Sequence, residues 1–226
     1  MPQSEIVVFD LDGTLIDADC AQEWLIFLRE KTFPGAVEAE LSCAAIMKNY
    51  DSGRMDMHEY MRHWVMPIKG MLVSDINDLA IEFAETSIRQ RLFPEGVARV
   101  SHHRKAGDTV LLISASPSLI VHPIAAMLGI EHVIGLNVHI QHQQIQSMLI
   151  EPLSYRAGKL TCLQKWLSQH GLTGSSLTYA YSDSINDRSL LEFAHTPIVV
   201  NGDRHIAGLA EQNAWRQVHW QVPALD

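Results

Sequence analysis

Hydrophobic positions along the chain fall into short apolar runs that alternate with longer segments of helical spacing. The clearest run, Ile-Val-Val-Phe at residues 6–9, is typical of a buried parallel strand. Comparable runs lie at residues 109–113, 177–181 and 197–200, and the segments between them repeat their apolar residues at helical intervals. Strands that alternate with helices in this way predict an α/β fold with a doubly wound parallel sheet.

Residues 18–90 do not follow this alternation. Their apolar residues recur at helical spacing, and the breaks between segments carry Pro and Gly, as at Pro34-Gly35. We therefore predict an all-helical cap domain at 18–90, inserted into an α/β core domain of residues 1–17 and 91–226. Residues 137–149 are predicted to form a β-hairpin or a strand pair.

Composition narrows the class of protein. The chain has 226 residues, of which 47% are hydrophobic and 19% charged, as in an ordinary globular protein. Its formal net charge of −9 argues against nucleic-acid binding, and no apolar stretch is long enough to predict a membrane span. The three cysteines lack the spacing of a disulfide framework or a zinc site, so we expect a cytoplasmic protein.

Four polar clusters lie where predicted strands end or where a predicted helix begins. They are Asp10 with Asp12, then Ser114, then Lys159, and finally Asp183 with Asp187. The carboxyl ends of parallel strands meet at one edge of a sheet, so we expect one pocket to collect all four clusters.

Each cluster suits one part of phosphoryl transfer from a monoester. Asp10 is the candidate nucleophile, and Asp12 is the candidate acid and base. Adjacent carboxylates repel each other unless a cation lies between them, which favours a Mg²⁺ site completed by Asp183. Lys159 and a hydroxyl at Ser114 would balance the charge of the phosphoryl oxygens.

Taken singly, these residues have simpler interpretations. Asp-x-Asp-Gly is also typical of a turn, and Ser114 alone favours a helix cap. Lys159 alone would be a solvated charge, and the segment from Asp183 to Asp187 a turn followed by a cap. The four clusters in this order are much more specific than any one of them.

The same segments resemble the four motifs of the haloacid dehalogenase (HAD) superfamily. They are Phe9–Leu15, Ile113–Ser116, Gly158-Lys159 and Tyr181–Asp187. The helical insertion after the first motif resembles that of the phosphoserine-phosphatase-like branch, which has a small helical cap. The resemblance implies a HAD-like, Rossmannoid core and a Mg²⁺-dependent phosphatase that works through an aspartyl phosphate.

The resemblance also implies a role for each matching residue. The implied catalytic residues are Asp10 and Asp12; the phosphate-binding residues are Ser114, Ala115 and Lys159; the metal ligands are Asp10, Asp12 (through its carbonyl) and Asp183; the supporting residues are Asn186 and Asp187. The implied partner is a small-molecule phosphate monoester, while the oligomeric state is left open.

Substrate choice depends on residues outside these motifs. Phosphoserine phosphatases carry a Glu for the substrate amine where this chain has Asp19, and two glycines where it has Ala115-Ser116. The second difference favours other small phosphomonoesters, histidinol phosphate among them, over phosphoserine. Asp19 fits either a contact to a substrate ammonium or a helix cap. Arg54 and Arg62 are candidates for a substrate carboxylate, although a solvated role is the more ordinary one.

Two other functions share part of this chemistry. A phosphotransferase would pass the same phosphoryl group from Asp10 to an acceptor alcohol, and the sequence does not separate it from a hydrolase. A receiver-type signalling module also groups Asp, Ser or Thr, and Lys around an aspartyl phosphate. The helical insertion at 18–90 argues against the receiver, because such modules are small and compact.

Overall fold

The computed structural model describes residues 5–48, 55–172 and 177–223. Its centre is a seven-stranded sheet of order β4-β3-β2-β1-β5-β6-β7, in which β3 and β4 are antiparallel and all other neighbours are parallel. The strands are β1 (Ile6–Phe9), β2 (Thr109–Pro117), β3 (His132–Gln141), β4 (Gln144–Ile150), β5 (Tyr179–Ser182), β6 (Thr196–Val200) and β7 (Arg216–Val218). The predicted α/β class and the mostly parallel sheet are confirmed.

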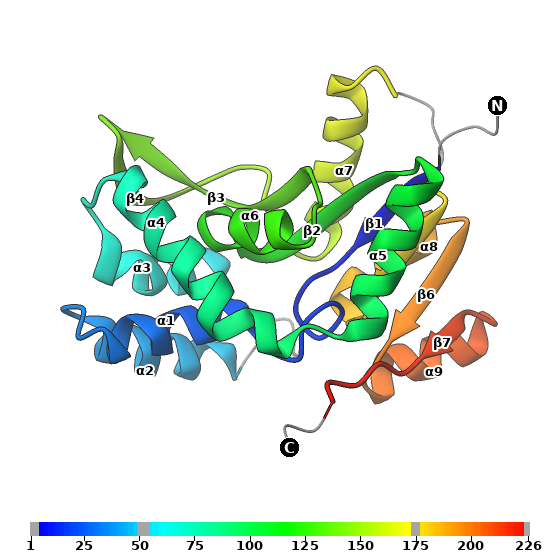
Figure 1. The fold of residues 1–226 in the computed structure, drawn as a ribbon, viewed down its shortest axis with the longest axis horizontal. Coiled ribbons are helices and arrows are strands. Elements are labelled where there is room, and N and C mark those ends of the chain that lie inside the picture. Colours follow the sequence, from blue (N-terminus) through cyan, green and yellow to red (C-terminus); the bar gives the residue numbers. More distant parts are fainter. Residues whose placement is uncertain (1–4, 49–54, 173–176, 224–226) are drawn as a thin grey trace.

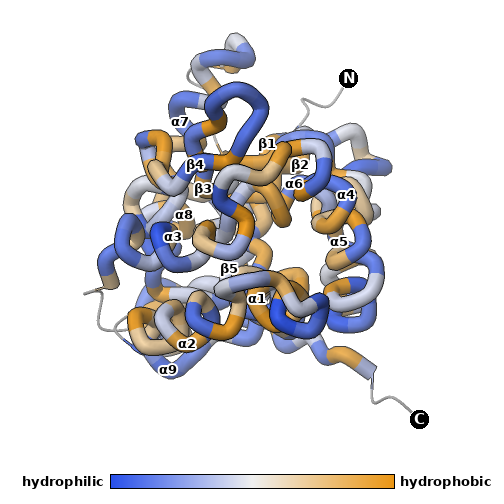
Figure 2. Tube along the Cα trace, turned by 90° about the vertical axis from the view of Figure 1, so that its left-hand side faces the viewer, coloured by the Kyte–Doolittle hydropathy of each residue, from blue (hydrophilic) through white to orange (hydrophobic). Residues whose placement is uncertain are grey.

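Helices cover both faces of the sheet (Figure 1). They are α5 (Pro94–Ala106), α6 (Ser118–Met127), α7 (Ala157–Gln169), α8 (Arg188–Phe193) and α9 (Arg204–Gln212). Val7 and Phe9 of β1 are buried in one hydrophobic cluster with α5 and α6, whereas Ile6 and Val8 are buried in a second cluster with α7, α8 and α9. Because successive strand residues face opposite sides, a run that is apolar throughout is what such a central strand requires. Figure 2 shows these apolar strands inside the molecule, with hydrophilic positions on the outer helices.

The segment between β1 and α5 is helical, as predicted. Its helices are α1 (Cys20–Glu30), α2 (Ala36–Met47), α3 (Met57–Val65), η1 (Met66–Ile68), α4 (Val73–Phe83), η2 (Ala84–Ile88) and η3 (Arg89–Arg91). Its aromatic residues are core, because Trp24 is fully buried and stacks on Phe27 at a centroid distance of 5.6 Å. Trp64 Nε1 donates a hydrogen bond of 3.0 Å to the carbonyl of Ala21, which ties α3 to α1.

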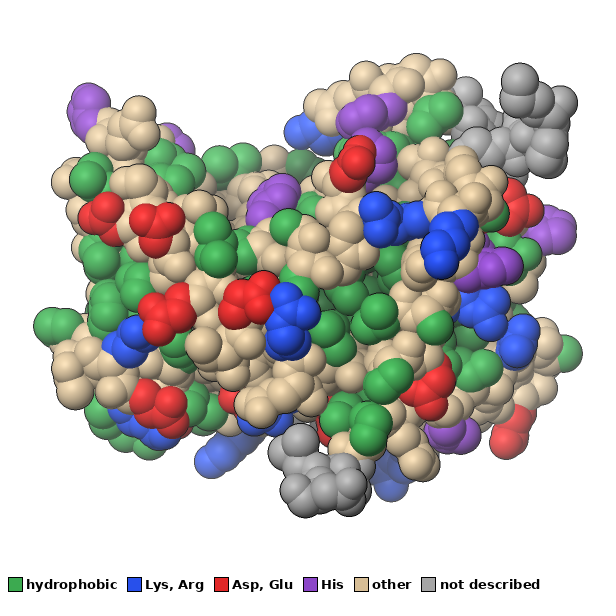
Figure 3. All heavy atoms as spheres, viewed as in Figure 1, with side chains coloured by type: hydrophobic (Ala, Val, Ile, Leu, Met, Phe, Trp, Pro, Cys, Tyr) green, Lys and Arg blue, Asp and Glu red, His purple; other side chains and the backbone are tan. Residues whose placement is uncertain are grey.

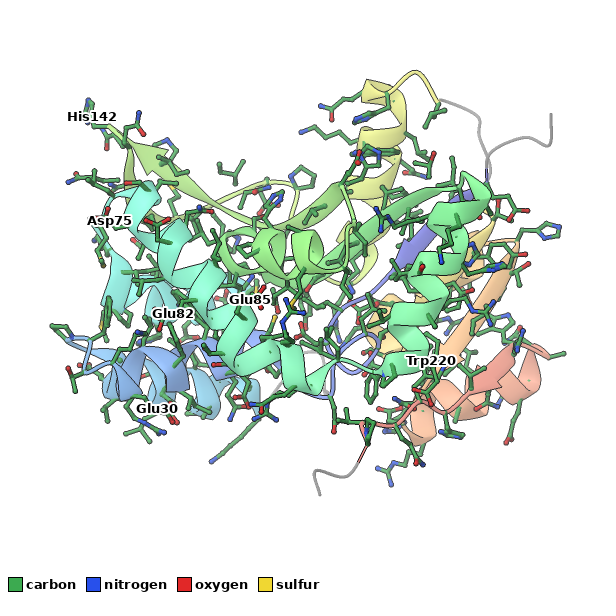
Figure 4. All side chains as sticks on the ribbon, viewed as in Figure 1. Glu30, Asp75, Glu82, Glu85, His142 and Trp220 are labelled. Carbon is green, nitrogen blue, oxygen red and sulfur yellow. The ribbon has the colours of Figure 1, made fainter. Side chains whose placement is uncertain are left out.

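The predicted hairpin is formed by β3 and β4, and it contacts the helical segment. The Gly70 N–H donates to the Ile145 carbonyl at 2.9 Å, and the Val73 N–H donates to the Gln143 carbonyl at 2.9 Å. His142 lies in the turn of this hairpin, and its side chain points away from the body of the molecule (Figure 4). Since one hydrophobic cluster includes residues from both β1 and α1–α4, the division into a core and a cap domain stays a prediction.

Strand β2 is longer than predicted, and this changes the interpretation of Ser114. The strand extends as far as Pro117, opposite Leu136, with a register shift in its pairing with β3 between Ile113 and Pro117, so Ser114 lies inside the strand and not at the start of a helix. Among the described residues no side chain caps α6, and the cap predicted for Ser114 taken alone is wrong.

Figure 3 shows acidic and basic side chains interspersed on the viewed face. No described helix has the length and apolar character needed to span a bilayer.

Candidate active site

A cavity of about 250 Å³ lies at the carboxyl ends of β1, β2 and β5, beneath the helical segment. Its wall includes five carboxylates and one amine, together with Met and Tyr side chains of the helical segment. The charged residues are Asp10, Asp12, Asp19, Lys159, Asp183 and Asp187. The structure thus brings together Asp10 with Asp12, Lys159, and Asp183 with Asp187 at the predicted edge of the sheet. The predicted Ser114 cluster contributes through its neighbours.

Lys159 lies between two acidic side chains in the interior. Its Nζ donates to Asp10 Oδ1 at 2.6 Å and to Asp187 Oδ2 at 2.7 Å, and Ser182 Oγ donates to the same Asp187 oxygen at 2.7 Å. Burial favours the neutral amine, but the charges of Asp10 and Asp187 outweigh it and raise the pKa of Lys159 above its usual value. Lys159 is therefore a fixed positive charge in the first turn of α7.

The carboxylates of Asp10, which is buried, and Asp183, which is partly buried, are joined by a threonine. The Asp183 N–H donates to Thr14 Oγ1 at 3.0 Å, and that hydroxyl lies 3.4 Å from Asp10 Oδ2 and 3.3 Å from Asp183 Oδ1. Burial raises the pKa of Asp10 to about 7, despite the opposing charge of Lys159. Burial and the negative charges of Asp10 and Asp187 raise the pKa of Asp183 well above its usual value.

Gly13 lets Asp183 come this close to β1. Its φ of +72° favours glycine, and a Cβ at this position would collide with the Asp183 carboxylate. Sequence analysis did not assign Thr14 a role. Its position directly after Gly13, in the first motif, is the signal that would have identified it.

Asp12 is held by hydrogen bonds to both carboxylate oxygens. The backbone N–H of Cys20, the first residue of α1, donates to Oδ1 at 2.7 Å. The Ser116 hydroxyl donates to Oδ2 at 2.8 Å, and the Ser114 hydroxyl lies 3.4 Å from the same oxygen. Asp12 therefore faces the cavity in a fixed orientation.

The second motif contributes differently from the prediction. Ser114 is fully buried and lies behind the cavity wall, whereas Ala115 and Ser116 form part of that wall. Ser114 Oγ accepts a hydrogen bond from the Ser116 N–H at 2.9 Å, and the Ser114 carbonyl accepts one from Ser154 Oγ at 2.7 Å. Sequence analysis noted Ser116 only as a difference from glycine, and assigned it no role.

The predicted substrate residues fall into different places. Asp19 caps α1, because its Oδ1 accepts from the Ala21 and Gln22 N–H groups, and the residue also lines the cavity. Its contact to a substrate ammonium stays a prediction. Burial and the nearby Asp12 charge raise the pKa of Asp19 to about 6. Arg62 is exposed on α3 and does not line the cavity, and Arg54 lies outside the described residues.

The outer wall is largely apolar, and sequence analysis did not identify it as part of the site. Met47, Met55, Met57 and Tyr60 line the cavity together with the carboxylates. Asn186, predicted to support the site, lies outside the cavity wall, where its Oδ1 accepts a hydrogen bond of 3.0 Å from Arg156 Nε.

Comparison with known proteins identifies the family. A model of the haloacid dehalogenase-like hydrolases matches residues 7–192. The chain belongs to this family. It is 30% identical over 213 residues to a histidinol-phosphatase of Neisseria meningitidis serogroup C (strain 8013), covering 93% of this chain and 96% of that protein.

Solved structures show the same fold. A Bordetella pertussis Tohama I protein described as having unknown function superposes with a TM-score of 0.87 at 27% identity, covering 96% of this chain and 99% of that one. A substrate-bound phosphoserine phosphatase superposes with a TM-score of 0.67 at 16% identity, covering 96% and 94% of the two chains. The predicted superfamily and enzyme class are confirmed, and this HAD hydrolase is a phosphoric monoester hydrolase.

Proposed function

We propose that this HAD phosphatase hydrolyses the phosphate monoester of a small amino alcohol, with Mg²⁺ and through an aspartyl phosphate on Asp10. The observation that carries the proposal is the position of Asp10. Its carboxylate lies on the cavity wall, 2.6 Å from the Lys159 amine, and shares that wall with Asp12 and Asp183. A carboxylate, a neighbouring acid and a fixed cation are the groups that transfer to an aspartate needs.

The donor set fits a Mg²⁺ ion. The carboxylates of Asp10 and Asp183 approach the same Thr14 hydroxyl, and the cavity wall carries five carboxylates against one amine. Hard oxygen donors with excess negative charge are the ligands that Mg²⁺ prefers. Asp10, Asp183 and the Asp12 carbonyl would hold the ion, which when bound supplies positive charge to the phosphoryl oxygens.

The protein side chains would then carry the two transfers. An Asp10 oxygen forms a bond to phosphorus while the bond to the ester oxygen breaks, and the Asp12 carboxylic acid protonates the departing alcohol. In the second step the Asp12 carboxylate accepts a proton from water as that water attacks phosphorus, which releases phosphate and restores Asp10. Lys159 and the backbone N–H of Ala115 would balance the charge of the phosphoryl oxygens.

The cavity supports an amino-alcohol ester as substrate. Asp19 uses only Oδ1 for its two capping bonds, and it lines the same cavity as Met47, Met55 and Met57. A carboxylate beside apolar side chains suits a cationic group on a carbon skeleton. Histidinol phosphate, named in the Neisseria relative, has this chemistry. Phosphoserine carries an additional carboxylate, and among the described residues no arginine lines the cavity to meet it.

The test is turnover of a panel of small phosphate esters by the purified protein. We expect phosphate release that requires Mg²⁺ and is abolished by EDTA, with histidinol phosphate preferred over phosphoserine. Asp10→Asn, which replaces the nucleophile with an isosteric amide, is expected to lower kcat by at least about 10³-fold with an unchanged circular dichroism spectrum. Wild-type rates in this variant would contradict the proposal. Transfer of phosphate to an added alcohol in preference to water would instead indicate a phosphotransferase.

A further inference from the structure

Ser116 is a polar side chain on the cavity wall that the proposed mechanism does not use. It is only 5% exposed, and its hydroxyl donates to Asp12 Oδ2 at 2.8 Å. We infer that Ser116 is a positioning residue that fixes the Asp12 carboxyl group in the orientation needed for proton transfer to the leaving oxygen. This inference rests on the proposed function, because it assigns Asp12 the role of acid and base.

Asp12 is held from two separate segments of the chain. The Cys20 N–H at the start of α1 holds Oδ1 at 2.7 Å, and Ser116 at the end of β2 holds Oδ2 at 2.8 Å. Rotation of the carboxyl group about its Cβ–Cγ bond would break one of these bonds. The pair therefore fixes the plane of the carboxyl group relative to the cavity.

Ser114 does not duplicate the contact made by Ser116. Its hydroxyl lies 3.4 Å from Asp12 Oδ2, beyond the usual length of an O–H···O hydrogen bond, and it already accepts from the Ser116 N–H at 2.9 Å. Without the Ser116 hydroxyl, Oδ2 would keep only this long contact. Cys20 alone would then hold the carboxyl group, which would be free to turn.

The orientation of Asp12 matters most for a basic leaving group. When the ester bond breaks, its electron pair moves to the leaving oxygen, and the Asp12 O–H must point at that oxygen to neutralise it. Each carboxyl oxygen has two acceptor positions, so the bonds from Cys20 and Ser116 leave room for this proton. A leaving group that is stable as an anion does not need the proton, so the rate of its release should not depend on Ser116.

Phenyl phosphate and p-nitrophenyl phosphate separate the two cases, because they share a ring and differ mainly in the basicity of the phenolate. The quantity to compare is kcat/KM, which includes transfer to Asp10 and excludes hydrolysis of the intermediate. General-acid catalysis is typically worth 10²–10⁴-fold, so a misaligned acid in Ser116→Ala should cost about tenfold on phenyl phosphate. The loss on p-nitrophenyl phosphate should stay within about twofold.

Two further variants control for size and folding. Ser116→Thr keeps a hydroxyl at the same position and should keep the wild-type ratio of kcat/KM for the two esters. Ser118→Ala removes a nearby hydroxyl that donates instead to Asn137 Oδ1 at 2.8 Å, and should leave both rates unchanged. The inference would be overturned if Ser116→Ala lost kcat/KM equally on both esters or lost none on either. It would also be overturned if Ser116→Thr showed the same ratio of kcat/KM for the two esters as Ser116→Ala. A wild-type protein that releases phosphate with Mg²⁺ from neither aryl ester nor histidinol phosphate would overturn the proposed function itself.

Discussion

At the scale of single residues, Lys159 shows how strongly the site depends on one buried charge. The residue is 3% exposed, and its amine contacts both Asp10 and Asp187 within 2.7 Å. Both partners are buried as well, at 5% and 1% exposed. Removing the amine would leave two acidic groups in the interior without a positive partner, which costs more than losing a surface ion pair.

We therefore expect Lys159→Met to lower the free energy of unfolding by about 3–5 kcal/mol and to abolish phosphatase activity. Urea unfolding at neutral pH, followed by circular dichroism, measures the change. Lys165→Met is the matched control, because Lys165 is exposed on the same helix α7 and should change stability by less than about 0.5 kcal/mol. Equal effects of the two substitutions would show that Lys159 does not hold the buried acids.

At the scale of elements, the start of α1 combines a helix cap with a wall of the cavity. Asp19 accepts from two backbone N–H groups of α1 through Oδ1, and α1 also supplies the Cys20 N–H that holds Asp12. The loop from β1 to α1 therefore ties the helical segment to the catalytic edge of the sheet. A substitution here can affect stability and substrate choice together, and the two effects need separate variants.

Asp19→Asn and Asp19→Ala separate these effects, because Asn caps a helix about as well as Asp but carries no charge. Asp19→Asn keeps the cap and removes the charge, so it should not lower the stability, while it lowers kcat/KM for amine-bearing esters and leaves p-nitrophenyl phosphate nearly unaffected. Asp19→Ala should lose the same selectivity and be about 1 kcal/mol less stable than Asp19→Asn. Thermal unfolding and rates on histidinol phosphate and p-nitrophenyl phosphate measure both quantities.

Asp56→Ala provides the control for the cap. Asp56 caps α3 by accepting from the His58 and Glu59 N–H groups, and it does not line the cavity. This variant should lose stability without changing the preference between the two esters. If Asp19→Asn also leaves that preference unchanged, Asp19 is only a helix cap and the amine contact is wrong.

Residues that follow strands could be predicted as part of the site, whereas residues on helix α3 could not. Asp10 and Asp183 could be predicted, because they lie within two residues of apolar runs whose ends must meet in a parallel sheet. Arg62 was chosen for its charge alone, although the apolar residues of α3 recur at Met57, Tyr60, Met61 and Trp64 and leave Arg62 on the opposite side. The same periodicity indicates a buried face. It does not distinguish Met57 and Tyr60, which line the cavity, from neighbours in the core.

At the scale of the whole molecule, the fold concentrates negative charge at one edge of the sheet. The chain carries a net charge of −9, and five of its carboxylates line one cavity with a single amine. The alternation of apolar runs predicted this edge, since it fixed which strand ends come together. The contacts within it could not be predicted. Ser116 lies on the cavity wall in the part of β2 where the pairing with β3 shifts register, between Ile113 and Pro117, and the apolar pattern does not show where such a shift occurs.

This concentration of charge makes the stability of the metal-free protein depend on pH in a definite direction. The pKa of Asp10 is raised from 3.8 to about 7, that of Asp19 to about 6, and that of Asp183 is raised as well. A raised pKa means that the native state holds its proton at a pH where the unfolded chain has lost it. The stability that depends on Asp10 and Asp19 is therefore lost as pH rises from about 4 to about 7, and the raised pKa of Asp183 adds to the loss in the same direction.

Mg²⁺ should reverse this loss, because a cation bound to Asp10 and Asp183 stabilises their charged forms. In EDTA we expect the Tm to be lower at about pH 8 than at about pH 5, and saturating Mg²⁺ should raise the Tm much more at the higher pH. Differential scanning fluorimetry at the two pH values, with and without Mg²⁺, measures this. Asp183→Asn should remove most of the Mg²⁺ effect, whereas Asp56→Ala, which changes a residue that does not line the cavity, should retain it. A Mg²⁺ effect that is equal at the two pH values, or that persists in Asp183→Asn, would place the ion away from these carboxylates.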